Sequence, residues 1–170
     1  MKFIFNTVNK KMISSWILVI IWMAVIYYFS NMNSIESNSK SKDTITNVIE
    51  NTIDTTNKLG ITDKHPSEEK KQELTNNLNE PLRKLMHAGE YLILSVLIMN
   101  ALIVSNRKLL MSFIITLIVS FAYAYSDEFH QTFVEGRTGR FTDVLIDTSG
   151  SIVGSGIYCL GYFIYKKVKK

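Results

Sequence analysis

The sequence has little charge and almost no cysteine. Charged residues make up only 20% of the 170 residues, whereas hydrophobic residues make up 46%. The single cysteine, Cys159, lies in the middle of an apolar run, which excludes a scaffold held together by disulfides. The chain also lacks a GxSxG sequence, a Walker loop, a dinucleotide-binding fingerprint and a reactive-cysteine context. No known enzyme class can therefore be named from motifs.

Four uncharged, mostly apolar runs hold most of the hydrophobic residues, and they lie at 12–30, 91–106, 109–126 and 148–165. Each run is about as long as a helix needs to cross the hydrocarbon core of a bilayer. A chain of 170 residues with four such runs has no length left for a large soluble domain. We therefore predict a single all-α integral membrane domain, in which four transmembrane helices form a bundle. The predicted spans are about 12–30, 85–106, 109–126 and 144–165.

The distribution of charge predicts how these helices are oriented. Basic residues without any acidic neighbour flank one side of the predicted spans: Lys2, Lys10, Lys11, Arg107, Lys108, Lys166, Lys167, Lys169 and Lys170. All 15 Asp and Glu fall in 31–90 and 127–147. Short flanks rich in Lys and Arg are typical of the cytoplasmic side of a membrane. We therefore expect both termini in the cytoplasm, and we attribute the basic excess to orientation and anionic lipid rather than to nucleic acid.

The first span begins after Lys10 and Lys11, as the apolar core of a signal peptide would. The residues at its outer end, such as Tyr27 and Tyr28, do not supply the small side chains that cleavage requires. We therefore predict an uncleaved membrane anchor.

The outer loop, 31–84, is polar but carries a helical period of apolar residues. Spacings of three or four relate most of the members of this set: Ile45, Val48, Ile49, Thr52, Ile53 and Leu59. Ser67 is placed to cap a second helix, and Pro81 is expected to interrupt or kink the entry to span two. The sequence leaves three arrangements of these short amphipathic helices open. They lie on the outer membrane surface, cover the bundle, or stay partly disordered.

Polar and ionisable residues gather where spans two, three and four reach the outer side. They form one stripe on each helix, with two arginines in the loop between the last two: Lys84, His87, Glu90 and Tyr91; Asp127, Glu128 and Gln131; Arg137 and Arg140; Asp143 and Asp147. Ionisable groups at the ends of spans are costly and usually face the interior of the bundle or water. This convergence predicts a polar pocket that faces outward.

Acid/base chemistry and anion binding are the functions that such a set can serve. We take His87, Glu90, Asp127 and Glu128 as candidate catalytic residues. The candidate substrate-binding residues are Lys84, Tyr91, Gln131, Arg137, Asp143 and Asp147. A divalent metal cofactor is compatible with the carboxylates and imidazoles, although no standard metal motif such as HExxH is present. The competing interpretation is a structural network of ion pairs around the two arginines.

The order and spacing of these residues resemble the VanZ-like family of small bacterial membrane proteins. The pattern is Lys84-x-x-His87-x-x-Glu90-Tyr91, Asp127-Glu128-x-x-Gln131-x-Phe133, Gly136-Arg137 and Asp143-x-x-x-Asp147-x-x-Gly150. The resemblance implies four helices with a variable outer loop in the bacterial cell membrane, and a link to teicoplanin resistance. Two positions depart from many relatives, which have an acidic residue where this chain has Arg83 and proline where it has Glu135.

Three hypotheses about function follow. The first is an envelope protein that lowers susceptibility to teicoplanin-type lipoglycopeptides, with the antibiotic or a cell-wall precursor as the partner. The second is a membrane enzyme acting on a phosphate- or carboxylate-bearing lipid-linked substrate. The third is a subunit of a homo-oligomer or larger complex, assembled through the small residues of span four, Gly150 and Gly154.

Overall fold

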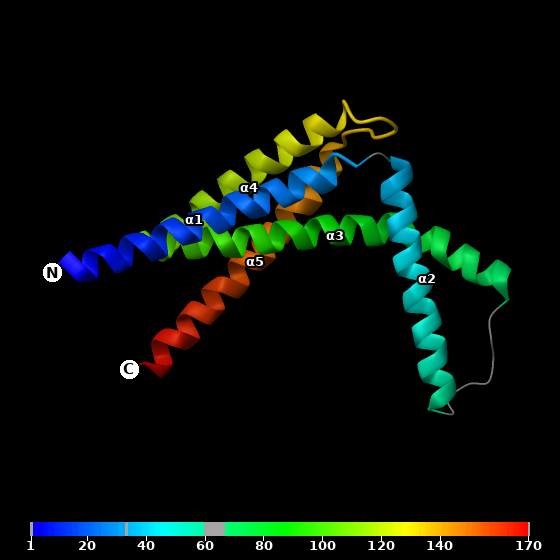
Figure 1. The fold of residues 1–170 in the computed structure, drawn as a ribbon, viewed down its shortest axis with the longest axis horizontal. Helices are drawn as coiled ribbons and strands as arrows, with labels where there is room; N and C mark the ends of the chain where they lie inside the picture. The colour runs from blue at the N-terminus through cyan, green and yellow to red at the C-terminus, as the bar shows by residue number, and fades with distance from the viewer. Residues whose placement is uncertain (1, 33, 60–66, 170) are drawn as a thin grey trace.

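The computed structural model describes residues 2–32, 34–59 and 67–169 (Figure 1). Over these ranges the chain forms five helices and no strand: α1 Lys2–Ser30, α2 Ser34–Lys58, α3 Glu68–Val104, α4 Leu109–Gln131 and α5 Phe141–Val168. All of these helices except α2 are long and apolar enough to cross a membrane. The predicted all-α membrane bundle, with an additional helix in the first outer loop, is confirmed.

The two ends of the bundle differ in charge. The α3–α4 turn, which carries Arg107 and Lys108, lies at the same end as the end of α5, and we call this the basic end (Figure 1). The α1–α2 connection and the loop 132–140 lie at the opposite end, which we call the loop end. The loop end is the one that the charge pattern predicts to face outward.

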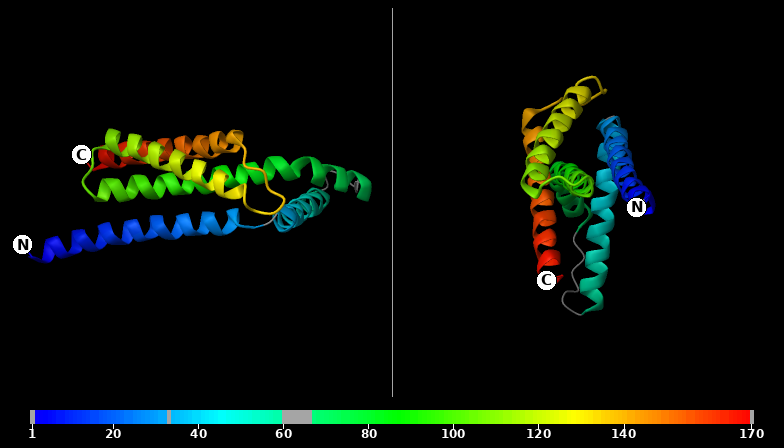
Figure 2. Two further views of the ribbon diagram at one scale, coloured as in Figure 1. Left: turned by 90° about the horizontal axis from the view of Figure 1, so that it is seen from above. Right: turned by 90° about the vertical axis from the view of Figure 1, so that its left-hand side faces the viewer.

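Helix α3 is the centre of the bundle, since each of the other helices packs against it. Figure 2 shows α1 lying along one flank of the group formed by α3, α4 and α5. The apolar core follows α3 and takes members from its neighbours: Val19, Ile26, Tyr91, Leu94, Ile98, Ala101, Leu102, Ala124 and Val144. The lipid-facing surfaces of the spans remain apolar, as expected for a bilayer as solvent.

The closest approach of two helices is the crossing of α3 and α5. A Cβ atom on Gly150 would collide with the backbone carbonyl of Ala88, and one on Gly154 would collide with the carbonyl of Leu92. Small residues at this spacing let helix backbones touch. These glycines, which the sequence offered as a face for assembly, pack inside the bundle instead, and because α3 occupies their face, that face is not free for a second copy of the chain.

Hydrogen bonds to aromatic side chains attach α1 to the bundle. The Trp22 indole N–H donates to the backbone oxygen of Glu90 at 2.9 Å, and the Tyr123 hydroxyl donates to the backbone oxygen of Met23 at 2.7 Å. At the loop end, the Tyr27 hydroxyl lies 3.3 Å from Nε2 of His130, so His130 contacts α1. These contacts hold α1 in register with α3 and α4, beside the loop end.

Helix α2 lies across the long axis of the bundle and contacts α3 (Figure 1). Its predicted apolar face is used there, since Ile45 is buried and Ile49 and Ile53 are partly buried. Val48, which belongs to the same pattern, is 58% exposed. Of the three arrangements considered for the outer loop, the described part of α2 is therefore a helix that packs on the bundle.

The second helix of the outer loop is continuous with the second span. Ser67 caps it as predicted, since its hydroxyl accepts the Lys70 backbone N–H at 3.4 Å. Helix α3 then passes Pro81 without a break. Proline removes the hydrogen bond to the carbonyl four residues earlier, that of Asn77. Asn77 and Pro81 are both exposed, so water can replace that bond and the helix tolerates the residue.

Candidate functional site

A polar cavity of about 230 Å³ opens at the loop end between α2, α3, α4, α5 and the loop 132–140. Seven of the ten predicted site residues line it: Lys84, His87, Glu128, Gln131, Arg137, Asp143 and Asp147. The other three, Glu90, Tyr91 and Asp127, lie beside it. The structure thus brings the polar ends of three helices together, and the roles of these residues remain predictions.

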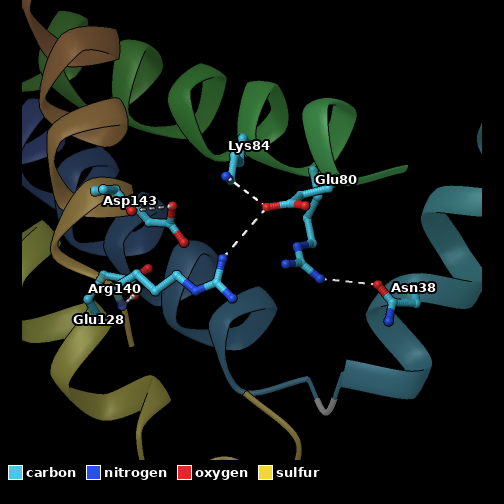
Figure 3. A network of polar contacts seen from close by, with 8 residues as sticks. Asn38, Glu80, Lys84, Glu128, Arg140 and Asp143 are labelled. Atoms are coloured by element: carbon cyan, nitrogen blue, oxygen red, sulfur yellow. Dashed lines mark hydrogen bonds and ion pairs between the residues drawn. The ribbon is translucent and has the colours of Figure 1, made fainter. Parts of the chain in front are cut away.

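Glu80 links two of the basic residues at the rim of the cavity. Its Oε1 lies 2.9 Å from Nζ of Lys84 and 3.7 Å from Nη1 of Arg140 (Figure 3). All three side chains are partly exposed, so the free energy of these ion pairs is small. Glu80 was missed in the sequence because it lies one turn before the recognised pattern, although its spacing of four from Lys84 was a usable sign.

The loop 132–140 folds back on the end of α4 and fixes Glu128. The Glu128 carboxylate accepts the backbone N–H of Arg140 at 2.9 Å. A Cβ on Gly139 would meet the backbone oxygen of Glu128, and Gly136 has a φ of 73°, which favours glycine. Both glycines are therefore needed for the loop to return over the carboxylate.

His87 and Glu90 form a contact on one face of α3. His87 Nδ1 lies 3.3 Å from Glu90 Oε2, and the two side chains are 19% and 16% exposed. Lys84, on the same helix, contacts Glu80 at 2.9 Å and not Glu90. An imidazole against a carboxylate is an arrangement that can accept and return a proton.

Asp127 and Asp147 are the most deeply buried carboxylates of the candidate site. Asp127 is 4% exposed, and its Oδ2 accepts the Gln131 amide at 3.3 Å, as expected for residues on one helical face. Asp147 is 2% exposed, and its Oδ1 has no hydrogen-bond partner. Tyr91 is fully buried in the core next to Tyr123, so it belongs to the wall behind the cavity rather than to its surface.

Arg83 and Arg137 approach the cavity without a carboxylate partner. Arg83 donates from Nη1 to the side-chain oxygen of Asn38 at 3.1 Å, and the buried Nε of Arg137 has no hydrogen-bond partner. Burial lowers the pKa of the Arg137 guanidinium, and the nearby charge of Arg83 lowers it further. Arg83 was missed as a site residue because the sequence pattern marked it only as a departure from relatives.

A metal ion finds no ready set of ligands in the described part of the chain. Over residues 2–32, 34–59 and 67–169, no group of three His, Cys, Asp or Glu side chains is arranged to hold one. The carboxylates instead point to different partners, such as Gln131 for Asp127 and the Arg140 N–H for Glu128.

Comparison with known proteins identifies one family. The sequence model of a family described as VanZ/LLP1 matches residues 15–164, which is most of the chain and includes every residue that lines the cavity. No curated protein and no solved structure matches.

Proposed function

Because the chain belongs to the VanZ-like family, a family of membrane proteins linked to antibiotic resistance, we propose that it lowers susceptibility to teicoplanin-type lipoglycopeptides. The finding that supports this proposal is the polar cavity at the loop end, which is lined by seven of the ten predicted site residues from three helices and one loop. The charge pattern predicts that this end faces outward, with both termini in the cytoplasm. The cavity then opens toward the envelope, where such antibiotics act.

We expect Glu128→Gln to remove the protection that the wild-type protein confers on a susceptible Gram-positive host. Glutamine still accepts the Arg140 N–H, so the loop keeps its place while the cavity loses one negative charge. The measurement is the inhibitory concentration of teicoplanin, with membrane levels checked by immunoblot. Glu69→Gln is the matched control, because Glu69 is exposed in the first turn of α3 and does not line the cavity. Equal protection by both variants would contradict a role for the Glu128 charge.

A second function is supported by the contact between His87 and Glu90. An imidazole 3.3 Å from a half-buried carboxylate is suited to general acid/base work on a phosphate- or carboxylate-bearing lipid-linked substrate. If the protein is such an enzyme, we expect the Glu90→Gln and His87→Asn variants each to give no protection against teicoplanin in the same host. Retention of full protection by both variants would rule out proton transfer by this pair and leave a binding role.

A further inference from the structure

A second, smaller cavity joins the polar one from the side of α1. It measures about 90 Å³, and Phe29, Met32 and Met86 give it a mostly apolar lining. Three residues, Arg83, His87 and Arg137, line both cavities. The combined site therefore has a polar part under the loop, an apolar part between α1, α2 and α3, and two guanidinium groups where the parts meet.

The two arginines at this junction lack an anion. Arg83 has only the neutral Asn38 as a side-chain partner, and Arg137 has a buried Nε without any. No carboxylate of the described residues lies within 4.0 Å of either guanidinium. Two like charges facing one cavity repel each other, and an anion between them would remove that repulsion.

The carboxylates around the junction are mostly engaged elsewhere. Glu80 contacts Lys84 and Arg140, Glu128 accepts the Arg140 N–H, and Glu90 contacts His87. Asp127 accepts the Gln131 amide, and Asp143 accepts the Thr142 hydroxyl at 3.4 Å. Asp147 has one unpartnered oxygen, but it is only 2% exposed. None of these groups lies within 4.0 Å of a guanidinium, so no carboxylate of the described residues pairs directly with either arginine.

Resting on the proposed envelope function of this site, we propose that Arg83 and Arg137 together bind the terminal phosphate, a monoester, of a membrane lipid, and that the first carbons of its hydrocarbon chain enter the apolar cavity. Guanidinium forks match phosphate oxygens in geometry and charge. The apolar side chains of this cavity, Phe29, Met32 and Met86, suit a hydrocarbon chain, which a free phosphate lacks; Lys40 and Glu90 also line the cavity. Phe29 and Met86 are 41% and 51% exposed, so the apolar cavity opens at the flank of the bundle where lipid lies.

A native tryptophan provides the assay. Trp22 donates its indole N–H to the backbone oxygen of Glu90, a residue that lines the apolar cavity. The chain has two tryptophans, and Trp16→Phe leaves Trp22 as the only one. The full-length Trp16→Phe protein in dodecyl maltoside is titrated with phosphatidic acid brominated on its chains, and quenching of Trp22 is followed. Brominated phosphatidylcholine with the same chains is the lipid control.

We expect phosphatidic acid to quench at about a tenfold lower mole fraction than phosphatidylcholine, as an added charged hydrogen bond would give. Arg83→Gln with Arg137→Gln should bring phosphatidic acid to the phosphatidylcholine level. Arg107→Gln, an exposed arginine at the basic end, should change nothing. Equal quenching by both lipids in the Trp16→Phe protein would overturn the proposal. This outcome does not depend on whether the arginine variants fold. Displacement of the lipid by millimolar inorganic phosphate would overturn the lipid assignment and leave a free-phosphate site.

The assay separates this inference from the proposed function. If phosphatidic acid binds as expected and the inhibitory concentration of teicoplanin does not change, the lipid site stands and the resistance proposal falls. If protection depends on Glu128 but both lipids quench equally, the resistance proposal stands and the lipid site falls.

Discussion

A single methyl group at Gly150 is expected to disrupt the bundle. Gly150→Ala would place a Cβ atom against the backbone carbonyl of Ala88, and a backbone atom cannot rotate away as a side chain can. The helices α3 and α5 must then separate at their closest crossing, beside the candidate site. We expect a loss of about 3 kcal/mol or more in the free energy of unfolding, at the upper end for overpacked cores.

The measurement is the fraction of monodisperse protein that survives heating in detergent, followed by size-exclusion chromatography. Gly161→Ala is the matched control, since it lies on the same helix and a Cβ there would have no atom within 4 Å. Alanine favours helix over glycine by about 1 kcal/mol, so the control should melt at the same or a higher temperature. Equal midpoints for the two variants would show that the close crossing is not what holds α5.

Asp147→Asn is expected to abolish protection against teicoplanin while leaving the protein at least as stable as the wild type. Asp147 is 2% exposed with one oxygen unpartnered, and a buried carboxylate without full hydrogen bonding destabilises a fold. Removing its charge should raise the free energy of unfolding by about 1 kcal/mol. A residue that is retained against stability in this way is expected to serve the site rather than the fold.

Two measurements on the same protein decide this prediction. The melting midpoint in detergent gives the stability, and the inhibitory concentration of teicoplanin gives the function. Asp54→Asn, on the exposed surface of α2, controls for loss of an acidic residue on the same predicted side of the membrane. A variant that is both less stable and inactive would assign Asp147 to the structural ion network considered from the sequence.

The length of the uncharged apolar runs was enough to predict the long helices, because bilayer thickness sets their length and lipid requires an apolar surface. The Ser67 cap was predicted from its residue type and its position before a helix, since a cap depends on one local hydrogen bond. The path of α3 through Pro81 was not predictable in the same way. Whether proline breaks a helix depends on the solvent exposure of the carbonyl it leaves unpaired, and exposure is a tertiary property.

The candidate site shows the same division. Helical spacing placed Lys84, His87 and Asp147 at one end of the bundle, because residues three or four apart share a face. It could not show that Arg83 lines the cavity together with Arg137, which lies in the loop 132–140. That placement depends on how the loop folds back over the end of α4, where the Glu128 carboxylate accepts the Arg140 N–H.

The size of the polar cavity limits how the proposed protection against teicoplanin would work. At 230 Å³ it is smaller than the roughly 300 Å³ that a drug-sized ligand requires, and a lipoglycopeptide is larger still. The cavity has room for a headgroup but not for the whole antibiotic. If the protein protects through this site, it does not do so by enclosing one whole drug molecule per protein. A protein that acts on a headgroup can act on many envelope molecules in turn, and protection would then persist when antibiotic molecules outnumber the protein.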